Sequence, residues 1–155
     1  MTTSKVARLS LGSPLEMPRP QPEQPPGLNE VYLFHGTGWD AAQTIAVNGF
    51  DPSRSGESAG SIFGQGAYFA AMPDLSLGYA EHYAQKHTTD PCLLICRVVL
   101  GAVSVCRGSC TGLRRPPPNC DSVVGEKGHP APSEFVVYRS EKAYPEYVVR
   151  LSKKP

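Results

Sequence analysis

The residues best suited to chemistry in this chain lie where short apolar segments end. His35 closes the segment VYLFHG and is followed by Gly36 and Thr37. Polar groups at such a place project from a rigid scaffold into a connecting loop, where ligands usually bind. Taken alone, an imidazole here is more often a core histidine than a functional one. The pattern becomes informative only together with other residues of the same kind.

Two aromatic residues, a hydroxyl and an acid complete the candidate set. Tyr68 stands in GQGAYFA, where glycines let a ligand approach the backbone closely. Ser76 and Tyr79 are three residues apart, so they share one face of a helix. Glu134 heads the apolar segment EFVVY, and a carboxylate buried there without a partner would cost free energy. The tyrosines also fit as core residues and Ser76 as part of a first helical turn, so the burial of Glu134 is the informative test.

Apolar segments and helical patterns predict the elements that position these residues. Strands are expected at 31–36, 66–70, 133–138 and 146–151, with a long β segment at 93–106 and a shorter apolar stretch at 121–125. One helix is expected to begin with Asp40 as its cap and to end at Gly49, and another to run from an Asp74 cap to Lys86. Polar loops fill the rest, and a turn through Pro145 joins the last two strands. This order of elements indicates an α+β domain.

Composition limits the class of protein. The chain has 155 residues, enough for one domain, and 15 basic against 14 acidic residues give a net charge of +1. This balance does not support nucleic-acid binding, and no apolar run reaches the length of a membrane-spanning helix. Residues 1–29 hold six of the 16 prolines and are expected to be a disordered leader. The folded domain is expected at 30–155.

Five cysteines, at positions 92, 96, 106, 110 and 120, are expected to be reduced thiols. The start of the chain lacks the apolar core of a secretory signal, which favours an intracellular protein of the nucleus or cytoplasm over a mitochondrial one. Cys92 and Cys96 would lie about 13 Å apart on a strand, too far for one metal ion. A zinc site made of the other three, with His129, is a weaker alternative because the spacing lacks a C-x-x-C pair.

The ordered combination of motifs is more specific than any one of them. The chain reads LFHGT, FGQGAYFA, S-x-x-Y, DSVVG and then EFVVY followed by AYPEYVV. This resembles the catalytic domain of the poly(ADP-ribose) polymerase family, the diphtheria-toxin-like ADP-ribosyltransferases, and the AYPEY motif resembles the tankyrase branch most. The resemblance covers 31–151. It implies the ADP-ribosyltransferase fold, with split, mostly antiparallel β-sheets and few helices.

The resemblance also implies roles for the residues. His35, Tyr68 and Glu134 match the catalytic His-Tyr-Glu triad of the family, in which the histidine binds the adenine-side ribose of NAD. The backbone of Gly36 and the hydroxyl of Ser76 match the groups that hold the nicotinamide carboxamide. The family sandwiches the nicotinamide ring between two tyrosines, which match Tyr68 and Tyr79. Thr37 stands at a Ser/Thr position near the ribose.

The implied reaction moves ADP-ribose from NAD, the co-substrate, to an acceptor and releases nicotinamide without a metal. Cleavage of the N-glycosidic bond develops positive charge on the ribose, which a fixed carboxylate such as Glu134 stabilises. The expected acceptor is a protein, for which the enzyme itself is one candidate, or an ADP-ribose. No membrane is expected to be involved, and the sequence does not give the oligomeric state. Family members without this acid are usually mono-transferases or inactive, so its presence favours poly or oligo transfer over mono transfer.

Two other functions are compatible with the same fold. One is a catalytically inert module that binds NAD or ADP-ribose, although such a module has no need of Glu134. The other is a transferase that moves a phosphate from RNA to NAD. That activity needs a basic surface, which a net charge of +1 does not support.

Overall fold

Seven strands and two α-helices form the part of the chain that this computed structural model describes, residues 27–54, 61–126 and 134–152. The elements in chain order are β1 (Glu30–Gly38), α1 (Trp39–Asn48), the 3-10 helix η1 (Pro52–Arg54), β2 (Ala67–Ala70), α2 (Pro73–His87), β3 (Pro91–Val99), β4 (Val103–Arg107), β5 (Ser122–Glu126), β6 (Glu134–Val137), the 3-10 helix η2 (Ser140–Lys142) and β7 (Ala143–Arg150). The predicted α+β class is confirmed. The expected leader lies almost entirely outside the described residues.

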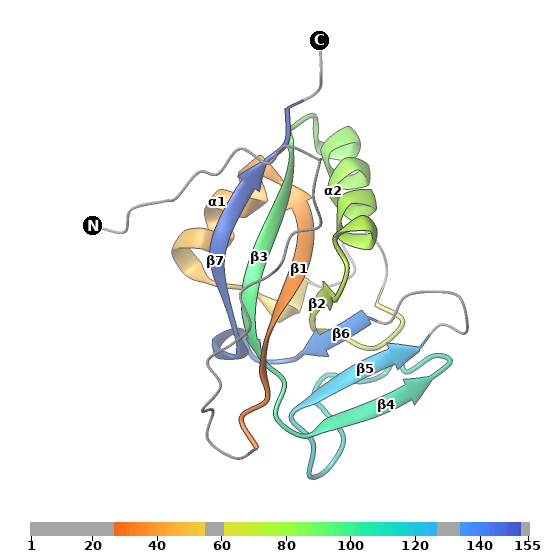
Figure 1. The fold of residues 1–155 in the computed structure, drawn as a ribbon. Coiled ribbons are helices and arrows are strands. Elements are labelled where there is room, and N and C mark those ends of the chain that lie inside the picture. Colours follow the sequence, from red (N-terminus) through yellow and green to blue (C-terminus); the bar gives the residue numbers. More distant parts are fainter. Residues whose placement is uncertain (1–26, 55–60, 127–133, 153–155) are drawn as a thin grey trace.

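The strands form one sheet in the order β4-β5-β6-β2-β1-β3-β7. Only β4 and β5 run parallel, so the sheet is mostly antiparallel, as predicted. Figure 1 shows β1, β3 and β7 as one group and β2, β6, β5 and β4 as a second group that runs across it. The two groups join at β1 and β2 through a single registered pair, Phe34 and Ala70. The expected split of the sheet therefore takes the form of this narrow junction.

The two helices cover opposite faces of the β1-β3-β7 group because successive strand residues point to opposite sides. Leu33 and Leu94 belong to the core cluster that contains Ala42 of α1. Phe34 and its partner Ile95 belong to a different cluster, against which α2 packs (Figure 1). The alternation along β1 thus decides which helix each of its residues faces.

Local boundaries differ from the sequence prediction where a cap or turn was inferred from one residue. The caps of α1 and α2 are Gly38 and Met72, without a side-chain hydrogen bond, so Asp40 and Asp74 lie inside the first helical turns. Negative charge favours the first turn of a helix as well as its cap, so an acid alone does not separate the two positions. The predicted Gly49 end of α1 is confirmed, with a φ of 80°.

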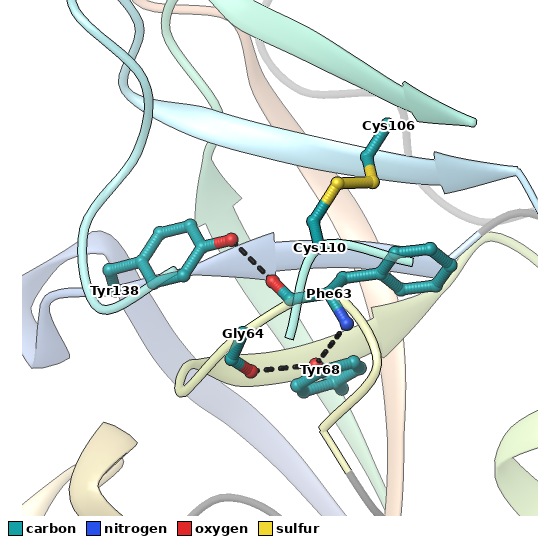
Figure 2. The surroundings of a disulfide bond; sticks show 6 residues. All are labelled: Phe63, Gly64, Tyr68, Cys106, Cys110 and Tyr138. Carbon is teal, nitrogen blue, oxygen red and sulfur yellow. Dashed lines mark hydrogen bonds between the residues drawn. A yellow bond between two sulfur atoms is a disulfide. The ribbon is translucent and has the colours of Figure 1, made fainter. Parts of the chain in front are cut away.

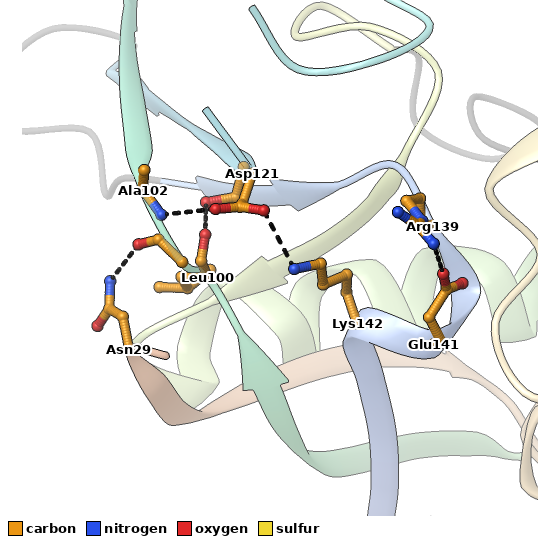
Figure 3. A network of polar contacts seen from close by, with 9 residues as sticks. Asn29, Leu100, Ala102, Asp121, Arg139, Glu141 and Lys142 are labelled. Carbon is orange, nitrogen blue, oxygen red and sulfur yellow. Dashed lines mark hydrogen bonds and ion pairs between the residues drawn. The ribbon is translucent and has the colours of Figure 1, made fainter. Parts of the chain in front are cut away.

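Two further boundaries in the β region also differ. The long segment at 93–106 divides into β3 and β4 at Gly101, whose φ of 56° turns the chain. Pro145 lies inside β7, and η2 makes the turn instead. Asp121 accepts hydrogen bonds from the amide of Ala102 and the ammonium of Lys142, and so ties this corner to η2 (Figure 3). Next to it, Arg139, which precedes η2, forms an ion pair with Glu141 inside η2.

The close approach of β1 to α2 depends on a residue without a side chain. A Cβ atom at Gly36 would stand 1.6 Å from the carbonyl oxygen of Ser76 and 2.9 Å from the amide nitrogen of Ala80. Both are backbone atoms of a packed helix and have little room to move. Gly36 is therefore a requirement of this packing as well as a candidate site residue.

We predict that Gly36→Ala destabilises the fold by about 3 kcal/mol or more, because overpacking against backbone forces the helix away from the sheet. Gly78→Ala is the matched control, since Gly78 lies in the same helix with no atom within 4 Å of its missing Cβ. That change should stabilise by about 0.5–1 kcal/mol through helix propensity. Urea unfolding of both variants measures the difference, and equal stabilities would contradict the packing argument.

Candidate functional site

The site lies at the junction between the two groups of strands, beginning at the end of β1. The Nδ1 atom of His35 lies 2.8 Å from the carbonyl oxygen of Tyr68 on β2. A carbonyl only accepts, so Nδ1 carries the proton and Nε2 of the neutral ring is the acceptor. The imidazole packs edge-on against Phe50 at 5.1 Å between ring centroids, and near Phe69. These contacts fix both the orientation and the tautomer of His35.

Burial lowers the pKa of His35 below its ordinary value of 6.5, and the hydrogen bond to the Tyr68 carbonyl offsets part of this effect. Desolvation disfavours the imidazolium more than that single bond favours it. The ring is therefore neutral at physiological pH. It can offer an acceptor at Nε2 but no second donor.

Glu134 is the buried acid on which the sequence argument depended. Its side chain is 2% exposed, and the hydroxyl of Tyr79 on α2 donates to its Oε1 atom at 2.6 Å. Burial, followed by this bond to the carboxylate, raises the pKa of Tyr79 well above its usual range. The side chain of Glu134 is therefore buried, and its carboxylate accepts a hydrogen bond from Tyr79 on another element, α2.

Tyr68 lies on the same face of the sheet as Glu134. The register of β2 with β6 pairs Ala70 with Glu134 and Tyr68 with Val136, and paired residues in antiparallel strands share a face. Tyr68 and Glu134 are thus diagonal neighbours, with Tyr79 reaching the acid from the helix. Burial raises the pKa of Tyr68 to about 12, and the nearby Glu134 adds to the effect.

The phenol oxygen of Tyr68 is engaged by the loop that precedes β2 (Figure 2). It accepts from the amide of Phe63 at 3.0 Å and donates to the carbonyl of Gly64 at 2.7 Å. The hydroxyl of Tyr138 donates to the carbonyl of Phe63 at 2.6 Å. The sequence prediction missed both Phe63 and Tyr138. Nothing in FGQG or EFVVY indicates that the Phe63 amide binds the Tyr68 hydroxyl, or that the Tyr138 hydroxyl binds the Phe63 carbonyl.

The remaining candidates divide between the two faces of β1. Gly36 meets the backbone of Ser76 on the α2 side, and Ser76 is 2% exposed. Thr37, 4% exposed, points to the same side as His35 because the two are separated by one residue. The structure therefore brings Gly36 and Ser76 together, and Tyr68, Tyr79 and Glu134 together. His35 joins them through the backbone of Tyr68, while its ring lies on the opposite face.

One backbone edge of β1 is unpaired by the described strands next to the candidate residues. β3 pairs with β1 along its whole length, from Glu30 to Gly38. On the other side β2 is registered only at Phe34, so no described strand pairs there with residues 35–38. Backbone groups on this edge, including those of Gly36, lie beside side chains from both faces.

The cysteines differ from the prediction of reduced thiols. Cys106, at the end of β4, and Cys110 form a disulfide with 6.6 Å between their Cα atoms (Figure 2). The pairing was missed because it depends on a turn at Gly108, whose φ of 100° brings the chain back. Cys92, Cys96 and Cys120 remain free, so the zinc alternative loses two of its ligands. In the described part of the chain, no group of three or more histidine, cysteine or acidic residues could hold a metal ion.

Comparison with known proteins places this chain in a family. The sequence model of the poly(ADP-ribose) polymerase catalytic domain family matches residues 7–131, and the chain belongs to that family. The match ends before β6, so it does not include Glu134.

Within the described residues no helix is long and apolar enough to cross a membrane.

Three curated relatives extend this finding. The mouse protein mono-ADP-ribosyltransferase PARP12 is 32% identical over 132 residues, which cover 81% of this chain and 17% of the relative. Human PARP11 is 28% identical over 80% of this chain and 42% of its own length, and human PARP14 is 31% identical over 81% and 7%. This chain thus spans less than half the length of these relatives. All three are named mono-ADP-ribosyltransferases, and they do not support the predicted tankyrase branch.

We predict that acid weakens the fold through His35. Because the folded pKa lies below 6.5, the unfolded chain binds more protons, and the free energy of unfolding falls as pH drops below about 6.5. The slope from this group is at most about 1.4 kcal/mol per pH unit. His35→Asn should flatten the profile between about pH 7.5 and about pH 5.5 in urea titrations, whereas His82→Asn, on the exposed face of α2, should retain it. An unchanged profile in His35→Asn contradicts the assignment.

Proposed function

We propose that this chain is the catalytic part of an NAD-dependent ADP-ribosyltransferase that modifies proteins. The observation that carries the proposal is the buried Glu134 carboxylate, held by the Tyr79 hydroxyl at 2.6 Å beside the Tyr68 ring. Burying a carboxylate costs free energy that one hydrogen bond offsets only in part, and its fixed position beside aromatic rings supports a role in charge stabilisation. Family membership supports NAD as the co-substrate.

The reaction breaks the bond between the ribose carbon and the nicotinamide nitrogen. Nicotinamide leaves with the bonding electron pair, the ribose carbon becomes electron-poor, and an acceptor nucleophile on a protein forms the new bond and loses its proton. Glu134 would stabilise the positive charge on the sugar, which develops mainly in the transition state. Its hydrogen bond to Tyr79 fixes the carboxylate before the charge appears, so little reorganisation is needed.

The other residues would bind and orient NAD. Tyr68 and Tyr79 offer flat apolar faces for the nicotinamide ring. The open backbone edge at Gly36, together with Ser76, suits the carboxamide, which presents one donor and one acceptor group. His35 offers Nε2 as an acceptor to a ribose hydroxyl, and Thr37 lies on the same face of β1.

The extent of transfer is a finer part of the proposal. The relatives named above are mono-ADP-ribosyltransferases, which supports transfer of one unit and does not support the polymer predicted from Glu134 alone. An acid can activate a ribose hydroxyl for elongation, but elongation also needs a site for the acceptor sugar. We therefore propose mono transfer to protein.

We predict that the wild-type chain incubated with labelled NAD and a protein mixture gives discrete labelled bands on a denaturing gel. A single transferred unit adds little mass, so each band stays sharp, whereas a polymer produces a smear. A smear would contradict mono transfer, and an unlabelled gel would indicate the inert binding module instead.

We predict that Glu134→Gln lowers the transfer rate by about 100- to 1,000-fold, as the loss of one preorganised group does elsewhere. NAD affinity should change little, because the lost charge acts on the transition state. Glu81→Gln, an exposed position of α2, is the matched control and should retain wild-type activity. Calorimetry and a labelled-NAD rate assay separate the two effects, and wild-type transfer by Glu134→Gln would refute the role of the acid.

A further inference from the structure

The loop closed by Cys106 and Cys110 packs against the segment that holds Tyr68. The amide of Cys110 donates to the carbonyl of Ile62 at 2.7 Å, and the amide of Gln65 donates to the carbonyl of Leu113 at 2.7 Å. A guanidinium nitrogen of Arg114 donates to the Gln65 side-chain oxygen at 2.7 Å. Three hydrogen bonds therefore join residues 110–114 to residues 62–65.

Residues 110–114 and 62–65 also pack closely, with little space between them. Gly64 adopts a φ of 91°, and a Cβ atom there would stand 2.4 Å from the carbonyl oxygen of Leu113. Phe63 is fully buried, and a Cβ atom at Gly125 would lie 2.2 Å from its ring. Any shift of 110–114 must therefore be passed on to the backbone at 63–64.

That backbone is the part which binds the phenol of Tyr68. The amide of Phe63 and the carbonyl of Gly64 are its two hydrogen-bond partners, and the Phe63 ring stacks near the Tyr68 ring at 6.4 Å between centroids (Figure 2). Two hydrogen bonds at the hydroxyl and the neighbouring Phe63 ring together hold the Tyr68 side chain in place. The contacts run without a gap from the disulfide to this candidate nicotinamide-binding ring.

The disulfide fixes the start of the loop to the sheet. Cys106 is 6% exposed and belongs to the core cluster that contains Phe63, Val136 and Tyr138. Cys110 packs against the same cluster. When the bond is broken, the side-chain cross-link between Cys106 and Cys110 is lost, and only the exposed residues 107–109 still connect β4 to residue 110.

We propose that the Cys106–Cys110 bridge is a positioning device for Tyr68, and that its reduction weakens the binding of nicotinamide. Reduction by a dithiol transfers two electrons and two protons: the sulfur–sulfur bond breaks, two thiols form, and the reductant becomes a cyclic disulfide. The loop then relaxes, and the backbone at 63–64 holds the phenol less firmly. The inference rests on the proposed function for the nicotinamide part and is independent of it for the loop.

The first experiment tests the bridge and the loop without any ligand. Alkylation of the unreduced, denatured chain should label three of the five cysteines, because the bonded pair does not react. Hydrogen exchange followed by mass spectrometry should show faster exchange of the amides of Phe63, Gln65 and Cys110 after reduction. Labelling of all five cysteines before reduction, or unchanged exchange after it, would overturn the proposal.

The second experiment compares two ligands. Reduction should weaken nicotinamide binding about fivefold or more, the lower end of ordinary coupling between sites. ADP-ribose lacks the nicotinamide ring, so its affinity should change less than about twofold if the effect acts on Tyr68 rather than on the whole fold. Equal losses for both ligands would indicate a general structural role and overturn the positioning role.

Variants identify the path of the effect. Tyr68→Phe removes the hydroxyl that contacts Phe63 and Gly64, so reduction should no longer change nicotinamide affinity in this variant. Cys106→Ser with Cys110→Ser should behave as the reduced wild type, and Cys120→Ser, a free cysteine, should retain the redox response. A full redox response in Tyr68→Phe contradicts the path. If neither redox form binds nicotinamide while exchange still responds, the proposed function is wrong and only the ordering of the loop stands.

Discussion

The two groups of strands meet at one registered pair, Phe34 and Ala70, and the geometry of the candidate site follows from this narrow junction. A continuous ladder between β1 and β2 would occupy the backbone edge at 35–38 and leave no edge for a ligand. The junction nevertheless lies between the two core clusters that pack on either side of β1, so it is held rigidly. A sheet that is joined but not closed offers a fixed backbone edge beside residues of both faces.

The position of the buried acid depends on the same packing that stabilises the fold. Glu134 lies at the start of β6. Tyr79, which donates a hydrogen bond to it, lies on α2, 55 positions earlier in the sequence. α2 can approach only because Gly36 has no side chain. Helix position, strand register and the hydrogen bond to the acid are therefore one coupled arrangement.

The Tyr68 ring illustrates a second level of support. Its hydroxyl is bound by the backbone at 63–64, which in turn is bound by Tyr138 and packed against Leu113. None of these supporting residues has a type that indicates chemistry. They hold the ring through backbone groups and shape, and packed interiors transmit small shifts because they contain few voids.

The sequence by itself determined the fold class, most strands, and the identity of the candidate residues, because hydrophobic periodicity and ordered motifs are local properties of the chain. It also singled out Glu134 as the acid whose burial should be tested, and the side chain is buried. It did not determine the helix caps, which are Gly38 and Met72, the turn, which η2 makes, or the pairing of Cys106 with Cys110. Only the tertiary structure decided these features, together with the partners of Glu134 and Tyr68. Tyr79 and Glu134 are 55 positions apart and meet because α2 packs against the sheet. The caps, the turn at η2 and the disulfide are local, and they depend on backbone angles that residue type alone does not fix.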